Sequence, residues 1–223
     1  MRVKICGTTG REDLEASVRA GADAVGFVAE YPDPVPWDLD REEAARLIDR
    51  VPPFVASVLV TTGDPDAVCD LARATRPDVV QLHGEEEPEA VESTVRALDR
   101  LGIRTIKAVA LSQGADPDEQ LASVLEFAAR GVDGLVVDAR ADDRRGGGTG
   151  RTVPRQLARD VVAETDVPVV LAGGLTPDNV AGAVETVRPY GVDVITGVER
   201  TRGRKDPEKL AAFVAAARGA GGQ

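Results

Sequence analysis

Residues 54–82 read FVASVLVTTGDPDAVCDLARATRPDVVQL, and this stretch contains the unit that decides the fold. The apolar run over 54–60 is short and rich in Val, which predicts a strand buried on both faces. Asp64-Pro65 places a capping residue before a proline and predicts a helix over 64–75. Turn residues end that helix, and a second Val-rich run over 78–82 follows. Strand, helix and strand in this order are typical of a parallel sheet.

The same alternation runs along the whole chain. The other expected strands are 2–6, 24–28, 103–109, 133–138, 168–172 and 192–196. Further helices are expected at 11–20, 41–50, 87–101, 116–130, 154–164, 177–188 and 206–218. Eight such units predict an α/β protein, a single (β/α)8 TIM barrel over 1–218 with a short flexible tail over 219–223. An open doubly wound sheet is the alternative, but no Gly-x-Gly-x-x-Gly follows any strand.

Short punctuation motifs repeat between these elements. Further helix starts with a capping residue before proline are Asp116-Pro117, Thr176-Pro177 and Asp206-Pro207. Every second strand is preceded by a tripeptide that ends in aspartate: Gly21-Ala22-Asp23, Arg76-Pro77-Asp78, Gly131-Val132-Asp133 and Gly191-Val192-Asp193. Turn formation is a sufficient explanation for these tripeptides, and their spacing supports the strand count.

Composition limits the classes of function. The 223 residues carry a formal net charge of −11, which argues against nucleic-acid and anionic-membrane partners. Cys6 and Cys69 cannot form a disulfide framework, and the start MRVKICGTTG has no export signal, so we expect a cytoplasmic protein. Only four of the 27 basic residues are Lys. An acidic, Arg-rich chain fits a salt-rich cytoplasm, as in a possible halophile, or a GC-rich genome.

In barrels of this type the chemistry lies where the strands end. Cys6 ends the first predicted strand and Asp138 ends the sixth, on opposite sides of the barrel. A thiol and a carboxylate that face each other across a pocket can serve as base and acid. Lys4 lies on the same strand face as Cys6 and would favour the thiolate. The alternative is that Cys6 is an inert small hydrophobic residue, which is also the expectation for Cys69 inside a helix.

The last two predicted strands end in small residues. Gly173-Gly174 and Thr196-Gly197 leave room for backbone N–H groups to approach an anion, which predicts a phosphate site. The alternative is that these glycines only make tight turns. His83 is the only histidine, so we expect no metal, and His83 either orients a loop or touches the ligand.

Taken together, six motifs between residue 3 and about residue 213 resemble the phosphoribosylanthranilate isomerase family. They are Lys4-Ile5-Cys6-Gly7, Gly21-Ala22-Asp23 with Gly26-Phe27, Gln81-Leu82-His83-Gly84, Gly147-Gly148-Thr149-Gly150, Leu171-Ala172-Gly173-Gly174-Leu175 with Asn179-Val180, and Gly197-Val198-Glu199 with Lys205-Asp206. The resemblance implies a cofactor-free enzyme of tryptophan biosynthesis, acting on a small phosphoribosyl substrate by an Amadori rearrangement. It makes Cys6 the general base and Asp138 the general acid, and it assigns the phosphate to Gly173, Gly174, Thr196 and Gly197.

One departure from the family falls at the end that would hold anthranilate. Most members have Ser-Pro-Arg after the second strand, and Trp37 stands where that Arg belongs. Trp37 can stack on an aromatic ring but cannot pair with a carboxylate. We therefore expect a cation from the loop after the sixth strand, where the candidates are Arg140, Arg144 and Arg145, with Gly148 and Gly150 beside them. These arginines could instead be solvated charges that offset nearby aspartates.

Two other functions stay open at this point. A paralogous Amadori-type isomerase could act on another N-linked ribose phosphate, as the change at Trp37 would allow. A barrel without activity could bind a sugar phosphate, but it would have no need of both Cys6 and Asp138. The sequence is compatible with a monomer or a homodimer.

Overall fold

The computed structural model describes residues 1–32, 35–139 and 153–221. Eight parallel strands form the barrel: β1 (Arg2–Ile5), β2 (Ala24–Ala29), β4 (Ala56–Thr61), β5 (Val79–Leu82), β6 (Arg104–Leu111), β7 (Gly134–Ala139), β8 (Val169–Leu171) and β9 (Gly191–Val194). Strand β1 pairs with both β9 and β2, which closes the sheet on itself. The predicted (β/α)8 barrel is therefore confirmed.

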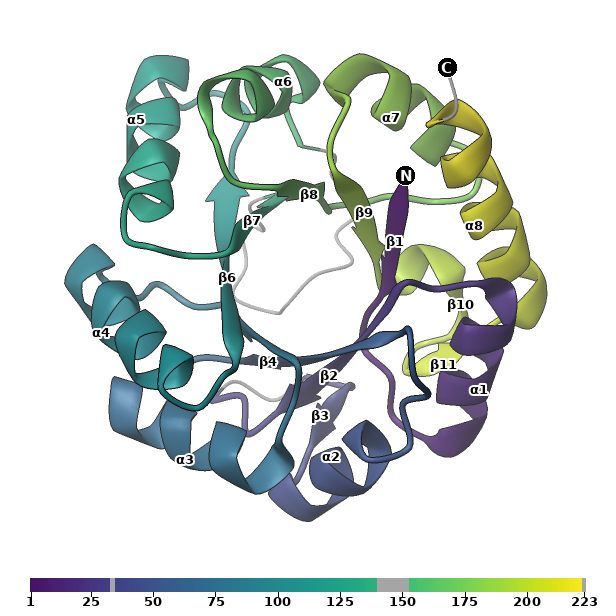
Figure 1. The fold of residues 1–223 in the computed structure, drawn as a ribbon. Helices are drawn as coiled ribbons and strands as arrows, with labels where there is room; N and C mark the ends of the chain where they lie inside the picture. Colours follow the sequence, from purple (N-terminus) through teal and green to yellow (C-terminus); the bar gives the residue numbers. More distant parts are fainter. Residues whose placement is uncertain (33–34, 140–152, 222–223) are drawn as a thin grey trace.

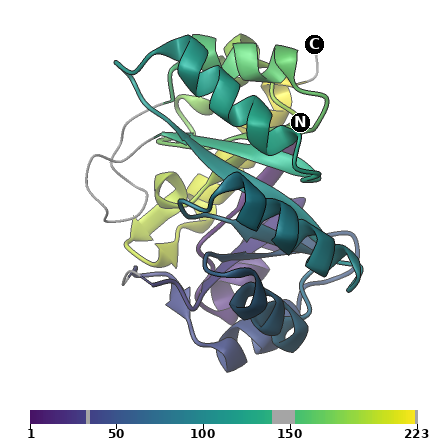
Figure 2. The same ribbon diagram turned by 90° about the vertical axis from the view of Figure 1, so that its left-hand side faces the viewer.

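A ring of helices surrounds the strands (Figures 1 and 2). In the described part of the chain these are α1 (Arg11–Ala20), α2 (Arg41–Ile48), α3 (Pro65–Thr75), α4 (Pro88–Asp99), α5 (Pro117–Ala128), α6 (Arg155–Glu164), α7 (Val180–Val187) and α8 (Pro207–Ala220). The main core lies between strands and helices, where Phe27, Leu59, Leu135 and Phe213 are fully buried. None of the described helices is long and apolar enough to cross a membrane.

Four short elements decorate the end where the strands finish. Strand β3 (Asp38–Leu39) pairs in parallel with the end of β2, and β10 (Glu199–Thr201) and β11 (Arg204–Lys205) form an antiparallel hairpin. The turn η1 (Thr196–Val198) leads into that hairpin. The last barrel strand was expected over 192–196, but it ends at Val194, because the chain turns into η1 from Thr196.

The capping predictions are confirmed at three helices and wrong at one. Asp64, Asp116 and Asp206 each accept hydrogen bonds from backbone N–H groups in the first turn that follows. The helix expected from residue 177 begins only at Val180. The reason is Asn179, whose Oδ1 accepts from the Thr176 N–H at 2.9 Å and whose Nδ2 donates to the Gly174 carbonyl at 2.9 Å. These hydrogen bonds therefore stabilise the loop after β8 instead of forming the first turn of the helix.

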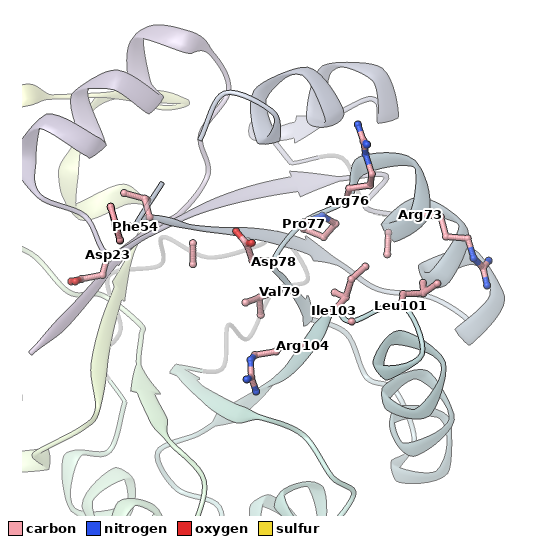
Figure 3. Close-up of a pocket in the computed structure, with 14 residues that line it drawn as sticks. Asp23, Phe54, Arg73, Arg76, Pro77, Asp78, Val79, Leu101, Ile103 and Arg104 are labelled. Atoms are coloured by element: carbon pink, nitrogen blue, oxygen red, sulfur yellow. The ribbon is translucent and has the colours of Figure 1, made fainter. Parts of the chain in front are cut away.

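The end where the strands begin differs from expectation at Phe54. The strand predicted over 54–60 starts at Ala56, because Phe54 has a φ of +72° and a fully exposed side chain. Phe54 borders a hollow of about 860 Å³, whose wall includes Asp23, Arg76, Leu101 and Arg104 (Figure 3). All of these residues lie at or before the first residues of strands. The hollow is therefore at the end of the barrel opposite to that where enzymes of this fold carry their chemistry.

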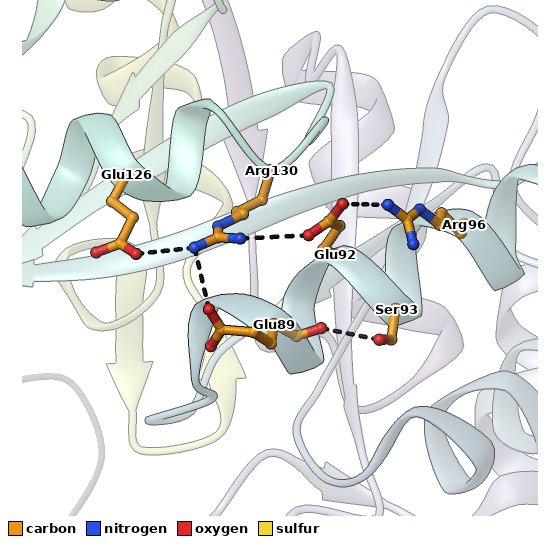
Figure 4. A network of polar contacts seen from close by, with 6 residues as sticks. All are labelled: Glu89, Glu92, Ser93, Arg96, Glu126 and Arg130. Carbon is orange, nitrogen blue, oxygen red and sulfur yellow. Dashed lines mark hydrogen bonds and ion pairs between the residues drawn. The ribbon is translucent and has the colours of Figure 1, made fainter.

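On the outside, an ion-pair network joins α4 to α5 (Figure 4). Arg130 contacts Glu126 at 2.9 Å, Glu89 at 3.1 Å and Glu92 at 3.3 Å. Glu92 also pairs with Arg96. Single surface pairs contribute little, but a shared guanidinium fixes several side chains at once.

Candidate active site

The carboxyl ends of the strands surround a pocket that contains most of the predicted site. Its wall includes Cys6, Trp37, His83, Asp138, Gly173, Gly174, Thr196 and Gly197. The structure thus brings together residues that are up to 191 positions apart in the chain. The remaining candidates, Arg140, Arg144, Arg145, Gly148 and Gly150, lie outside the described residues.

Cys6 sits directly after β1 and is held in place by two neighbouring strands. Its N–H donates to the Val194 carbonyl at 2.9 Å, and its side chain is 2% exposed. A Cβ atom at Gly26 would lie 2.5 Å from the Cys6 sulfur, so glycine on β2 makes the space that the sulfur occupies. The thiol therefore depends on the absence of a side chain at Gly26.

A buried ion pair lies behind Cys6 in the barrel. The register of β1 and β9 places Lys4 opposite Asp193, and the Lys4 Nζ is 2.6 Å from the Asp193 Oδ2. Both side chains are almost fully buried. Although burial lowers it, the neighbouring Asp193 and Cys6 raise the pKa of Lys4 above its ordinary value, so the ammonium is charged.

The Cys6 thiol is protonated at neutral pH. Burial raises the pKa of Cys6 above its ordinary value, and the Lys4 ammonium offsets this only in part. The expected direction of the Lys4 effect is confirmed, but it does not outweigh burial. The Lys205 ammonium also lowers the pKa of Cys6, by less than Lys4 does.

Asp138 faces the same pocket from β7. Its backbone is aligned with Ala110 on β6, and its side chain is partly exposed. A carboxyl group with access to the pocket can exchange a proton with a bound molecule. The pocket therefore contains a buried thiol directly after one strand and a solvent-accessible carboxyl group on another.

The loops after β8 and β9 are shaped by glycine. Gly173 and Gly174 have φ angles of +83° and +62°, the left-handed region that glycine adopts most readily. A Cβ atom at Gly197 would lie 1.9 Å from the Leu175 carbonyl oxygen, so only glycine permits this approach of the two loops. Asn179 holds the first loop through the Gly174 carbonyl. Such closely apposed, side-chain-free loops are suited to an anion.

His83 is neutral and belongs to a small polar cluster. Burial, with the Lys107 and Lys4 ammonium groups, lowers the pKa of His83 to about 4. Its Nδ1 lies 2.9 Å from the Gln81 Nε2, and the Tyr31 hydroxyl donates to its backbone carbonyl at 2.6 Å. All three residues line the pocket. Of the two roles considered for His83, these contacts describe the orientation of a loop.

Trp37 forms the wall of the pocket on the side of the hairpin. Its side chain is buried, and its Nε1 donates to the Glu199 Oε1 at 2.6 Å. The Lys205 Nζ is 3.3 Å from the same oxygen. The sequence placed Glu199 and Lys205 in family motifs without a role, and it did not pair Asp193 with Lys4. The facing positions of Lys4 and Asp193 on the first and last strands were a usable indication.

The comparisons with known proteins agree with this geometry. Residues 3–216 match the family model of N-(5′-phosphoribosyl)anthranilate (PRA) isomerase. The N-(5′-phosphoribosyl)anthranilate isomerase of Haloferax volcanii is 46% identical over 222 residues, which cover 99% of this chain and 95% of that one.

Two solved structures have the same fold over almost the whole chain. One contains monomers generated from the dimeric phosphoribosylanthranilate isomerase of Thermotoga maritima; the TM-score is 0.80 at 33% identity, and 98% of this chain and 99% of that one are covered. The other is a phosphoribosylanthranilate isomerase in complex with reduced 1-(o-carboxyphenylamino)-1-deoxyribulose 5-phosphate, with a TM-score of 0.79, 34% identity and the same coverage. With its barrel, its motifs and these matches, the chain belongs to the N-(5′-phosphoribosyl)anthranilate isomerase family.

Proposed function

We propose that the pocket catalyses the Amadori rearrangement of N-(5′-phosphoribosyl)anthranilate to 1-(2-carboxyphenylamino)-1-deoxyribulose 5-phosphate, with Cys6 as general base and Asp138 as general acid. The observation that carries these two roles is that a buried thiol and an accessible carboxyl group line one pocket, beside two glycine loops suited to phosphate. The activity is that of the family, an aldose–ketose isomerisation in tryptophan biosynthesis.

The acid acts first. Asp138 donates its proton to the furanose ring oxygen, the bond from that oxygen to C1′ breaks, and the nitrogen lone pair completes a protonated imine. The base then removes the proton from C2′, and the electrons of that bond move toward the imine nitrogen to give an enolamine. Tautomerisation of the enolamine yields the ketone. Each step moves only protons and electron pairs: Asp138 and the base exchange protons with the substrate, and the protonated imine accepts the electrons.

The base must lose its proton before it can act. Because burial raises the pKa of Cys6, the thiolate is a minor form in the unliganded enzyme. The Lys4 ammonium stabilises that thiolate, and Asp193 keeps Lys4 charged and in place. Gly173, Gly174, Thr196 and Gly197 hold the phosphate, so the sugar is anchored while its ring opens. Trp37 and His83 form the remaining wall of the pocket.

A steady-state assay with N-(5′-phosphoribosyl)anthranilate tests the function directly, because conversion is followed by the loss of anthranilate fluorescence. We expect turnover at a rate typical of enzymes, about 1–1000 per second. Turnover of another N-linked ribose phosphate with none of this substrate would favour the paralogous isomerase. Tight binding without turnover of either would favour the barrel without activity.

We also propose that the enzyme is a homodimer joined through the end where the strands begin. The large apolar side chains that are exposed in the described part of the chain are Phe54, Leu101 and Tyr190, and each lies just before a barrel strand. Exposed apolar residues that gather on one face mark a contact surface. The dimeric state of the Thermotoga maritima protein supports this proposal.

Light scattering coupled to gel filtration tests the dimer. Phe54→Glu puts a charge on this face, and we expect it to shift the mass from dimer to monomer. Because the pocket is at the other end, kcat should stay within about twofold, while Phe54→Leu should remain dimeric. A wild-type chain that is monomeric at all concentrations would contradict the proposal.

The cytoplasm is the proposed location of the enzyme. The chain is acidic and poor in Lys, and it is similar to a protein of Haloferax volcanii, which supports a cytoplasm rich in salt. The substrate is a phosphorylated metabolite, which agrees with an intracellular reaction.

A further inference from the structure

We propose that Arg202, at the tip of the β10–β11 hairpin, binds the carboxylate of the substrate and thereby makes the enzyme selective for aryl amines that carry this group. The inference rests on the proposed function, because it concerns the aryl end of the same substrate. It adds a specificity residue that neither acts on the reacting atoms nor holds the phosphate.

The aryl carboxylate needs a cation, because a carboxylate that enters a partly dry pocket without a partner loses its hydration. The lysines near the mouth are already engaged. Lys4 pairs with Asp193 at 2.6 Å and Lys205 with Glu199 at 3.3 Å. Lys107 is buried and contacts Glu86 at 2.9 Å. These ammonium groups neutralise buried carboxylates and are not available to a ligand.

The hairpin concentrates positive charge beside the pocket. Four of the six residues over 200–205 are basic, in a chain whose net charge is −11. Arg200, Arg202 and Arg204 all have exposed side chains. A local positive potential on an acidic protein attracts a substrate that carries both a phosphate and a carboxylate.

The tip of the hairpin is fixed against the pocket wall. The Thr9 hydroxyl donates to the Gly203 carbonyl at 3.0 Å. Gly203 has a φ of +80°, and a Cβ atom there would be 3.4 Å from the Pro36 carbonyl oxygen. Pro36 precedes Trp37, so the tip is packed against the segment that carries this indole.

Arg202 is placed by Trp37 itself. Its guanidinium carbon lies 5.5 Å from the centre of the Trp37 ring, a cation–π distance, and Trp37 is anchored by Glu199 and lines the pocket. With the residues that the structure describes, Arg202 forms no ion pair. Its planar fork of N–H donors is therefore available to a carboxylate, with which it makes two parallel hydrogen bonds.

The test measures binding by calorimetry, independently of turnover. The probes are reduced 1-(2-carboxyphenylamino)-1-deoxyribulose 5-phosphate and its 1-phenylamino counterpart, which lacks the carboxylate. For Arg202→Met we expect the Kd of the first probe to rise about 10- to 150-fold, and that of the second to change less than about threefold. Arg202→Lys, which keeps the charge without the fork, should fall between wild type and Arg202→Met.

Arg200→Met is the matched control, because it removes the same charge from the same hairpin but not from the Trp37 ring. It should affect both probes equally and weakly. The inference is overturned if Arg202→Met weakens both probes alike, or if it weakens neither. It is also overturned if replacing Arg140, Arg144 and Arg145 by Ala abolishes the preference while Arg202→Met preserves it. A wild-type enzyme that prefers the carboxylated probe but does not turn over N-(5′-phosphoribosyl)anthranilate contradicts the proposed function alone.

Discussion

The two ends of the barrel use aspartate differently, although the tripeptides that contain it look alike. Where the strands begin, Asp23, Asp78 and Asp133 accept hydrogen bonds from backbone N–H groups of the preceding strand, at 2.8–2.9 Å. Asp193 stands in the same sequence context, but β9 begins at Gly191, so Asp193 lies inside the strand. Its carboxylate then reaches Lys4 within the barrel.

This difference distinguishes aspartates that stabilise the fold from charged residues that lie near the pocket. The three aspartates at the end where the strands begin are partly solvated, and their hydrogen bonds connect adjacent strands, as turn residues do. Behind and beside the pocket, Lys4, Asp193, Glu199 and Lys205 are buried charges, which cost desolvation and are tolerated only as pairs. The end that holds the pocket thus carries groups that a purely structural barrel has no need of.

The largest expected effect concerns the two residues proposed as general base and general acid. Cys6→Ser and Asp138→Asn should each lower kcat by about 10²- to 10⁴-fold, the usual contribution of a positioned base or acid. KM should change far less, because neither residue holds the phosphate. Asp133→Asn is the control from the opposite end, and its kcat should match wild type in the fluorescence assay. Near-normal kcat in Cys6→Ser would exclude the thiol base.

The next effect is on stability. Lys4→Met leaves the buried Asp193 without its partner, so we expect the free energy of unfolding to fall by about 3–5 kcal/mol. Asp133→Asn weakens partly solvated hydrogen bonds at the end where the strands begin. It should lower the free energy of unfolding by only about 1 kcal/mol. Urea titration measures both. The double variant Lys4→Met with Asp193→Leu should recover most of the lost stability. Equal losses of stability in Lys4→Met and Asp133→Asn would contradict the distinction between the two groups of aspartates.

A smaller effect follows from His83, whose pKa is lowered to about 4 in the folded chain. The unfolded chain takes up this proton below about pH 6.5 and the folded chain does not, so the stabilisation is complete above pH 6.5 and is lost as pH falls toward 4. Because His83 is partly exposed, we expect a loss of about 2 kcal/mol in wild type that His83→Asn does not show. Urea titrations at pH 7 and pH 4.5 compare wild type with His83→Asn. Equal losses of stability in the two proteins would contradict a lowered pKa of His83 in the folded chain.

Much of the architecture could be predicted because it depends on local sequence. Val-rich runs, capping residues before proline and paired glycines depend on a few neighbouring positions. They located the eight units and the two glycine loops that line the pocket. The predicted start of α7 was wrong because the Asn179 side chain forms hydrogen bonds with the loop after β8, and the helix begins only after it. Phe54 has an apolar side chain but a left-handed backbone, which residue type alone does not reveal.

The contacts around Trp37 show where prediction from sequence stops. The family resemblance predicted that Trp37 lies in the pocket, but its hydrogen-bond partner Glu199 is 162 positions away. A hydrogen bond between distant segments depends on how the barrel closes, and one sequence does not report it. The same holds for Arg202, whose place on the indole requires the hairpin to be packed against Pro36.

The burial of Cys6 also has a consequence for its redox chemistry. The thiolate is the form that reacts with peroxides and alkylating reagents, and a thiol that is buried and has a raised pKa is mostly protonated. The residue proposed as the general base is thus protected from oxidation while its thiol is protonated. Cys69 in α3 is buried as well, and its pKa is also raised by burial. Both thiols of the chain are therefore poor targets for oxidants while the barrel is folded.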